Sequence, residues 1–347
     1  MRHLGLLALL AIAAVGAGAG WLDSQISRPY SGHRPEKVFV DIPRGASRWD
    51  IAGILRQNDV IRNRVAFGLY SRWHFRKPLQ AGEYLFDHPL DSRETFWKIA
   101  HGEIFVQTIT VPEGWTMYDI ANQLDRQDIC HRADFLAAAH NTSLISDLDP
   151  HARTLEGFLF PSTYQFKRHT SCQQIVSTMV RHFRSAWSAI TASAPSSVTP
   201  PAEAVTLASL VERETPRPDE RPLVAGVFYN RLHRGYPLQC DPTVQYALLI
   251  KGHPVAHVRP EDLRVDSPYN TYEHRGLPPG PIANPGEASL RAALSPVPTD
   301  YLYFVADDQG GHSFSRTLEE HNRNVARLRR IRSGDVPQNV SSLSKHD

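Results

Sequence analysis

The sequence lacks the short motifs that mark several common catalytic chemistries. It contains no Gly-x-x-x-x-Gly-Lys phosphate loop, no Gly-x-Gly-x-x-Gly turn after a strand, no His-Glu-x-x-His pair and no Gly-x-Ser-x-Gly turn. His253 and His257 are four residues apart, but Pro254 would interrupt the helix needed to align them. We therefore expect neither a metal ion nor a cofactor.

A strong excess of one charge is also missing. The 347 residues include 38 Lys and Arg against 36 Asp and Glu, a net charge of only +2. No global basic field is available to attract nucleic acid, so nucleic acid is not an expected partner. A chain of this length, with 41% hydrophobic and 21% charged residues, is typical of a globular protein with room for two domains.

Cysteine is scarce as well. The three residues are Cys130, Cys172 and Cys240, and an odd number precludes a fully paired intramolecular framework. Their spacing matches no zinc pattern. A Cys130–Cys172 disulfide and three free buried thiols remain open alternatives.

What the sequence does contain, at its start, is one long apolar run. Leu4 to Leu22 is uncharged over 19 residues, and as a helix it would extend about 28 Å, close to the roughly 30 Å of a bilayer core. The apolar region of a secretory signal is usually shorter, although "GAGAG" could supply a cleavage site. We favour a retained membrane anchor over residues 1–22, with its N-terminus inside and the rest of the chain outside the cytoplasm.

Two segments of the first half repeat each other with an offset of 69 residues. They are "VFVDIPRGASRWDIAGILRQNDVI" (38–61) and "QTITVPEGWTMYDIANQLDRQDIC" (107–130). Each shows a strand pattern, a Pro-x-Gly turn and an amphipathic helix, with Ser47 or Thr116 as the expected helix cap. The repeat therefore predicts one strand–turn–helix unit used twice.

The Gly-x-Ser/Thr and Ile-Ala pattern of each copy resembles the start of a LysM motif, a small module that binds N-acetylglucosamine polymers. We interpret residues 37–130 as a LysM-like repeat region. Sugar binding there would require Trp49 and Tyr118 to be exposed as stacking platforms. A structural or substrate-orienting role is the favoured alternative, because the repeated apolar residues also form the core face of a helix.

A single carboxylate, Glu156, lies in the apolar and aromatic run "LEGFLFPSTY" (155–164). Glutamic acid ordinarily has a pKa near 4.3, and apolar surroundings disfavour its charged form. A pKa of roughly 6 would make Glu156 a usable general acid at neutral pH. Taken alone, the run is equally compatible with an exposed glutamate at the edge of a strand. Glu212, Glu214 and Asp241 are the other acidic candidates.

Eight motifs follow one another between residues 155 and 322. They are "LEGFLFPSTY", "ASLVERET", "AGVFYNRL", "LQCDPTVQYAL", "SPYNTY", "GLPPGPIANPGEASLRAA", "YLYFVAD" and "GGHSFS…HN". Together they resemble the endolytic murein transglycosylase family, also called YceG-like or MltG. The resemblance implies cleavage of β-1,4 bonds between N-acetylmuramic acid and N-acetylglucosamine within peptidoglycan strands, with 1,6-anhydromuramic acid ends that terminate nascent strands. It also implies glycan strands as substrate, peptidoglycan synthases as candidate partners, and an inner-membrane protein with a periplasmic catalytic domain.

The resemblance places the essential acid on Glu156. The other motif residues that suit substrate binding are Glu212, Asn230, Gln239, Asp241, Asn270 and Tyr272. The amide and hydroxyl groups of Asn230, Gln239, Asn270 and Tyr272 fit the polar groups of sugars, while hydrogen bonding that stabilises loops is the alternative for each. Glu212 would line the cleft or hold a loop through a buried ion pair. Cys240 departs from the family pattern, in which relatives often have a small polar residue.

One carboxyl would suffice for this reaction, because the C6 hydroxyl of muramic acid replaces the water that ordinary glycosidases activate with a second carboxylate. Two other classes remain open. A hydrolytic muramidase would use Asp241 or Glu212 as the base, and a non-catalytic glycan-binding scaffold would need no tuned Glu156.

From about residue 150 the sequence mixes helices and short strands without βαβ regularity, which predicts an α+β catalytic domain over residues 150–332. With a membrane helix over 1–22, LysM-like modules over 37–130 and a tail over 333–347, the chain is predicted to be an α+β protein.

Overall fold

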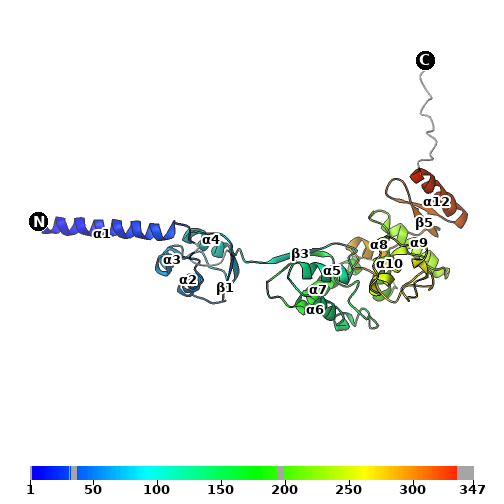
Figure 1. Ribbon diagram of the computed structural model, residues 1–347, viewed down its shortest axis with the longest axis horizontal. Coiled ribbons are helices and arrows are strands. Elements are labelled where there is room, and N and C mark those ends of the chain that lie inside the picture. The colour runs from blue at the N-terminus through cyan, green and yellow to red at the C-terminus, as the bar shows by residue number, and fades with distance from the viewer. Residues whose placement is uncertain (1, 31, 33–36, 194–198, 334–347) are drawn as a thin grey trace, which may run out of the picture. The chain divides into compact units, whose positions relative to one another are not determined.

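The computed structural model describes residues 2–30, 32, 37–193 and 199–333 (Figure 1). The chain forms two compact units: unit 1 is Met1–Gln107 with Gln165–Arg168, and unit 2 is Thr108–Tyr164 with His169–Asp347. Helices account for 49% of the residues and strands for 10%. In the described part of the chain the strands form two-stranded sheets. The predicted α+β class is therefore confirmed.

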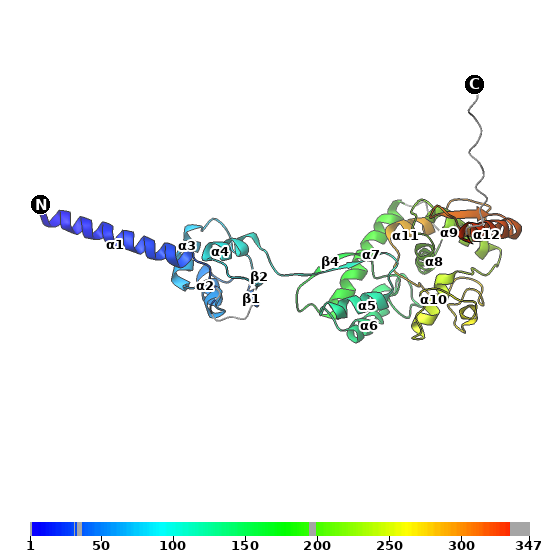
Figure 2. The same cartoon turned by 45° about the horizontal axis from the view of Figure 1, so that its top comes forward.

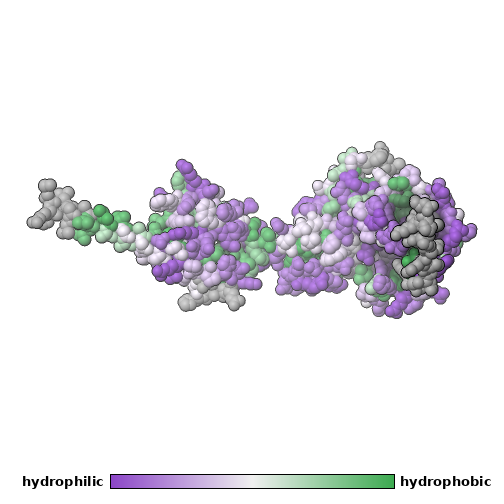
Figure 3. Space-filling model, turned by 90° about the horizontal axis from the view of Figure 1, so that it is seen from above, coloured by the Kyte–Doolittle hydropathy of each residue, from purple (hydrophilic) through white to green (hydrophobic). Residues whose placement is uncertain are grey.

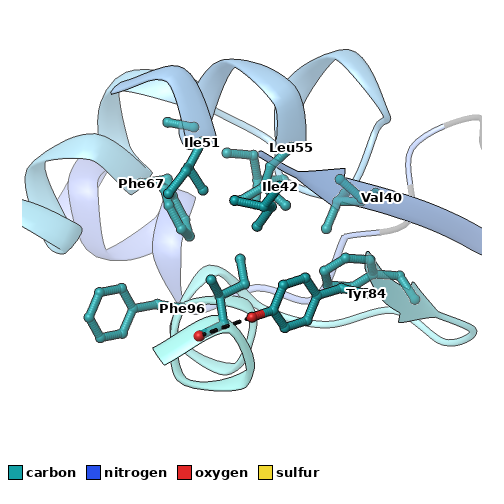
Figure 4. Close-up of a cluster of buried hydrophobic side chains, with 12 residues drawn as sticks. Val40, Ile42, Ile51, Leu55, Phe67, Tyr84 and Phe96 are labelled. Atoms are coloured by element: carbon teal, nitrogen blue, oxygen red, sulfur yellow. Dashed lines mark hydrogen bonds between the residues drawn. The ribbon is translucent and has the colours of Figure 1, made fainter. Parts of the chain in front are cut away.

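Unit 1 is built from helices around one strand pair. Its elements are α1 (Arg2–Ile26), β1 (Val38–Ile42), α2 (Arg48–Gln57), α3 (Arg64–Trp73), β2 (Gly82–Phe86) and α4 (Ser92–His101). β1 and β2 pair antiparallel, and alternate side chains of both strands are buried against α2, α3 and α4 (Figure 4). The core includes Val40, Ile42, Ile51, Leu55, Phe67, Tyr84 and Phe96. Buried apolar residues alternate along β1 and β2 and recur three to four residues apart along α2, so they face the same side and form this core.

The two repeated segments form the same strand–turn–helix unit, as predicted. Ser47 caps α2, and Thr116 caps α5 (Met117–Arg126), each in a reciprocal capping box with the third residue of its helix. The turn glycines Gly45 and Gly114 have φ of 82° and 77°, a conformation that side chains with a Cβ rarely adopt. The LysM likeness of these segments stays a prediction.

The boundary between the two units lies at residue 107, inside the predicted 37–130 repeat region and not after it. The first copy of the repeat belongs to unit 1 and the second to unit 2. In the second copy, β3 (Gln107–Val111) pairs with β4 (Ser162–Phe166), and α5 packs against α6 (Arg132–Ala139). The second copy therefore shares a core with the segment that contains Glu156.

Unit 2 is mostly helical. Its further elements are η1 (Thr142–Ile145), α7 (Cys172–Ser193), α8 (Pro201–Glu214), α9 (Arg221–His233), α10 (Asp241–Ile250), η2 (Asp262–Arg264), α11 (Glu287–Leu294), the strands β5 (Tyr303–Ala306) and β6 (His312–Ser315), and α12 (Leu318–Ser333). α8 is the central helix: eight consecutive residues from Ala204 to Val211 are buried, and it packs against α9, α10 and α11 (Figure 2). Apart from Ser333, the predicted tail lies outside the described residues.

The predicted N-terminal anchor lies within α1. Leu9–Ile26 forms an 18-residue apolar window with a mean hydropathy of 1.3, of which 6% is buried. Figure 3 shows hydrophobic residues, in green, along this helix. A helix of this length extends about 27 Å, close to the thickness of a bilayer core. α1 continues past Leu22 to Ile26 and contacts α3 and α4, with an ion pair of 2.5 Å between Asp23 and Arg93.

Cys130 and Cys172 form a disulfide with a Cα–Cα distance of 5.7 Å, while Cys240 is a buried free thiol. Of the two alternatives that the sequence left open, the structure therefore contains the disulfide. It joins the segment before α6 to the first residue of α7. The loop that it closes contains Glu156.

We expect replacement of both Cys130 and Cys172 by serine to destabilise unit 2. The cross-link joins residues 42 apart, and restricting an unfolded loop of that size is worth about 4 kcal/mol. Hydrogen exchange of the α6 and α7 amides in the full chain, at increasing denaturant, measures the loss. Reductant should produce the same loss in the wild type and no change in the variant. Equal protection of the variant and the oxidised wild type would contradict this expectation.

Candidate active site

Glu156 lies in a turn between η1 and β4 and is only 2% exposed. It is therefore neither an exposed residue nor part of a strand. Gly157 has a φ of 87°, and a Cβ there would lie 2.4 Å from Pro281 Cγ and 3.0 Å from Val205 Cγ1. Close packing and a backbone conformation that favours glycine together fix the turn that directs Glu156 inward.

The first partner of Glu156 is the N-terminus of α5. The Met117 backbone N–H donates to Glu156 Oε1 at 2.9 Å and to Oε2 at 3.1 Å. Met117 is the first residue of its helix, where a backbone N–H has no partner within the helix and the helix dipole favours a negative charge. The second copy of the repeat thus supplies a donor to the buried carboxyl.

The second partner is Asn284, which is fully buried. Its Nδ2 donates to Glu156 Oε1 at 2.8 Å, and its Oδ1 accepts the backbone N–H groups of Gly157 and Leu159 at 2.9 Å each. Since Oδ1 faces two N–H donors, the orientation of the amide is determined. Asn284 therefore holds both the carboxyl and the turn that carries it.

Aromatic hydroxyl groups complete the site. Tyr246, on α10, donates to Glu156 Oε2 at 3.3 Å, and its ring lies 5.0 Å from that of Tyr269. Tyr118, on α5, and Tyr269 are close enough that, after burial, the charge of Glu156 raises the pKa of both phenols. The carboxyl is thus surrounded by aromatic rings with polar tips.

Burial raises the pKa of Glu156 to about 8, while the hydrogen bonds from Met117, Tyr246 and Asn284 oppose the shift. The direction agrees with the prediction from the apolar run. Such a group is roughly nine-tenths protonated at pH 7. Each oxygen accepts from two donors, but the contacts of Oε1 (2.9 and 2.8 Å) are shorter than those of Oε2 (3.1 and 3.3 Å). We therefore place the acidic proton on Oε2.

Glu212, at the end of α8, is held by a buried ion pair. Its Oε1 accepts from Arg221 Nη2 at 2.9 Å and its Oε2 from the Gly286 backbone N–H at 3.0 Å, with side chains of Glu212 and Arg221 only 5% and 6% exposed. Burial raises the pKa of the neighbouring Glu214, and a hydrogen bond between Glu214 and Cys240 opposes that shift. Both oxygens of Glu212 are therefore engaged in fixing the loop before α11.

Asp241 and Tyr272 are brought together by the structure. The Tyr272 hydroxyl donates to Asp241 Oδ1 at 2.5 Å. Asp241 is exposed and begins α10, the helix that carries Tyr246. This pair is thus a polar surface feature on an element of the Glu156 site.

The remaining three candidates hold loops. Asn230 and Asn270 each donate their side-chain amide to two backbone carbonyl oxygens at 2.7–2.9 Å, and Asn270 is fully buried. Gln239 accepts from Arg231 Nη2 at 2.6 Å. These contacts correspond to the loop-stabilising alternative that the sequence left open for each residue.

Asn284 and Tyr246 were not singled out from the sequence. They lie 128 and 90 residues from Glu156 along the chain, so no local pattern links them to it. The available signal was only that Asn284 and Tyr246 lie within two of the motifs, "GLPPGPIANPGEASLRAA" and "LQCDPTVQYAL". Among the described residues, no group of three His, Cys, Asp or Glu side chains could hold a metal ion.

Fold and site together define an α+β protein whose candidate reactive group is one buried glutamic acid. The sequence profile of the YceG-like family matches residues 40–327. The chain belongs to this family.

Relatives of known name share most of the chain. An endolytic murein transglycosylase of Bacillus subtilis (strain 168) is 35% identical over 322 residues, covering 88% of this chain and 89% of the relative. One of Streptococcus pneumoniae is 30% identical and covers 92% of this chain, which spans 64% of that longer relative. A crystal structure of a YceG-like protein from Listeria monocytogenes matches with a TM-score of 0.54 and 34% identity, over 83% of this chain and 98% of that one.

We expect Gly157→Ala to destabilise the protein more than Gly276→Ala does. The two glycines have φ of 87° and 86°, but a Cβ at Gly276 meets nothing within 4 Å, whereas one at Gly157 collides with Pro281. The control measures the backbone strain alone, about 1–2 kcal/mol, and overpacking should add about 1–3 kcal/mol at Gly157. Denaturant unfolding compares the two, and equal losses would contradict the packing argument.

Glu156 should also make stability depend on pH. Its folded-state pKa of about 8 lies above the value near 4.3 expected in the unfolded chain. The folded state therefore retains a proton that unfolding releases, so this group's contribution is full below about pH 4 and falls as pH rises towards 8. Glu156→Gln has no such proton to release.

We therefore expect the melting temperature of Glu156→Gln to rise relative to that of the wild type as the pH increases from about 5 to about 8. The change in their difference in stability should be at least about 1 kcal/mol, because each unit of pKa shift is worth about 1.4 kcal/mol. Thermal melts across this pH range measure it. Glu319→Gln, an exposed carboxylate on α12, is the control and should follow the wild type. A gap between Glu156→Gln and the wild type that does not change with pH would refute the raised pKa.

Proposed function

We propose that this chain is an endolytic murein transglycosylase that cleaves the β-1,4 bond between N-acetylmuramic acid and N-acetylglucosamine inside glycan strands. The observation that carries the proposal is the buried Glu156, held by Met117 N–H, Asn284 and Tyr246 within a family motif. The names of the B. subtilis and S. pneumoniae relatives support the same reaction.

In the first step Glu156 acts as general acid. Oε2 gives its proton to the glycosidic oxygen, the bond from that oxygen to muramic C1 breaks, and N-acetylglucosamine leaves with a free hydroxyl. The carboxylate left behind retains the N–H donors of Met117 and Asn284 and the dipole of α5. The protonated and the ionised Glu156 carboxyl can therefore keep the same hydrogen-bond donors, and no side chain has to move between the two states.

In the second step the same group acts as base. The carboxylate takes the proton from the muramic C6 hydroxyl, whose oxygen bonds to C1 and closes the 1,6-anhydro ring. Glu156 is protonated again and no water is consumed. Because the nucleophile belongs to the substrate, its high effective concentration replaces a second catalytic carboxylate. The engagement of both Glu212 oxygens by Arg221 and Gly286 favours this route over a hydrolytic one with Glu212 as base.

The other predicted residues take two roles in this proposal. Asp241 and Tyr272, paired at the start of α10, contact sugar hydroxyl or N-acetyl groups directly. Glu212, Asn230, Gln239 and Asn270 shape the substrate site through the loops that they hold.

α1 anchors the enzyme in the inner membrane as a single span, with its N-terminus in the cytoplasm and both units in the periplasm. The apolar helix and the Cys130–Cys172 disulfide support this location, since disulfides persist in oxidising compartments. There the enzyme would end strands as peptidoglycan synthases extend them.

Glu156→Gln should lower the rate of anhydro-end formation at least about 10²-fold, the lower end of what general acid–base catalysis contributes. The amide oxygen can still accept from Met117 and Asn284, and the amide nitrogen can donate to the Tyr246 hydroxyl, so the fold should survive. Mass spectrometry of murein digested by the purified full-length protein measures the products.

Glu319→Gln is the matched control and should retain wild-type activity. A folded Glu156→Gln protein with near wild-type rate would exclude Glu156 as the acid. Wild-type products one water heavier than anhydro ends would identify a hydrolytic muramidase, and binding without cleavage would identify a scaffold.

A further inference from the structure

Unit 1 exposes an apolar helix face. Val65, Leu69 and Trp73 follow one another on α3 at a spacing of four residues and are 52%, 45% and 85% exposed, and the nearby Phe75 is 67% exposed. Residues four apart lie on one side of a helix. We call these four residues the α3 face. Large apolar side chains gathered in this way usually mark a surface that binds something.

The end of the α3 face is held in a defined conformation. The Arg48 guanidinium donates four hydrogen bonds of 2.6–3.0 Å to the segment 71–77. His74 turns inward, with its ring 4.4 Å from that of Tyr70 and 5.3 Å from that of Phe96. Trp73 and Phe75, on either side of His74, are thus presented outward by an ordered backbone.

Basic side chains flank this face. Arg72, Arg76 and Lys77 are exposed, and the Arg76 guanidinium lies 5.7 Å from the centre of the Phe75 ring. Exposed aromatic rings combined with Arg and Lys are typical of segments that lie in a membrane interface, where the rings reach the acyl boundary and the cations meet phosphate.

The α3 face adjoins the end of the apolar helix. Leu22 and Ile26 of α1 line one open hollow of about 550 Å³ together with Leu69 and Trp73. The apolar window of α1 ends at Ile26. If α1 spans a bilayer, Leu69 and Trp73 therefore lie at the depth where the hydrocarbon core gives way to headgroups.

We propose that the α3 face inserts into the interface of the same bilayer that α1 crosses. Trp73 and Phe75 lie among the upper acyl chains, and Arg72, Arg76 and Lys77 bind the phosphates of anionic phospholipids. Unit 1 is then fixed against the membrane surface at two places, α1 and the α3 face. This inference rests on the proposed anchor and is independent of the proposed reaction.

Spin labelling of the full-length protein in phosphatidylcholine vesicles, with and without phosphatidylglycerol, tests the proposal. A nitroxide is attached to Trp73→Cys, to Val15→Cys in the apolar window, and to Asp41→Cys. Asp41 is exposed on β1, a strand that Figures 1 and 2 show on the side of unit 1 away from α1. The native cysteines do not compete, since two form the disulfide and Cys240 is buried. Relaxation by oxygen, which enters lipid, and by a polar nickel chelate, which does not, reports the depth of each label.

At positions 15 and 73 we expect oxygen to relax the labels more than the chelate does. Phosphatidylglycerol should strengthen this preference for oxygen at position 73. At position 41 the chelate should relax the label more than oxygen does. A lipid signal at 15 with a water signal at 73 would overturn the proposal while leaving the anchor intact. Water signals at both would overturn the anchor as well. A label at 73 shielded from both reagents would identify a protein partner, such as a second copy, and would also overturn it.

Discussion

The contact on which the rest of unit 2 depends is the one between the Glu156 carboxyl and the N-terminus of α5. A carboxyl this deeply buried is costly unless its oxygens have partners. Met117 N–H and Asn284 Nδ2 are such partners, and each comes from a segment distant in sequence. Asn284 also accepts the N–H groups of the turn after Glu156. Placing one acid therefore fixes the relative positions of α5, the Glu156 turn and the loop before α11.

The repeat explains how this contact could arise from an ordinary structural module. Met117 occupies the position of Arg48, and Tyr118 that of Trp49. In the first copy, the Arg48 side chain holds the end of α3, and the Trp49 ring packs against Gly68. In the second copy, the backbone N–H of Met117, at the position of Arg48, donates to the Glu156 carboxyl. The same capped helix start thus holds the end of α3 in unit 1 and the buried Glu156 carboxyl in unit 2.

Local features of the fold could be predicted from the sequence, whereas contacts between distant segments could not. The capping boxes at Ser47 and Thr116 follow from short-range hydrogen-bond chemistry, so the repeat predicted both helix starts. Glu156 became a candidate because its apolar neighbours are adjacent in sequence, but only the resemblance to a family favoured it over an exposed glutamate. Asn284 could not, because its amide acts only after the chain has folded 128 residues back. The pairing of β3 with β4, which joins residues 107–111 to residues 162–166, is a contact of the same long-range kind.

In the proposed reaction one group must serve as acid and then as base, which constrains its pKa from both sides. Burial alone would favour the neutral acid so strongly that the carboxylate left after the first step would be costly to form. Donors alone would favour the anion and leave too little acid at neutral pH. Glu156 combines burial with donors to both oxygens, of which the shortest contacts, from Met117 N–H and Asn284 Nδ2, are made to Oε1. These donors stabilise the anion, while Oε2 has only the longer contacts, so in the proposed reaction the same oxygen releases the proton and recovers it. The proposed reaction needs no second carboxyl, because the C6 hydroxyl of the substrate replaces the water that a second carboxylate would activate.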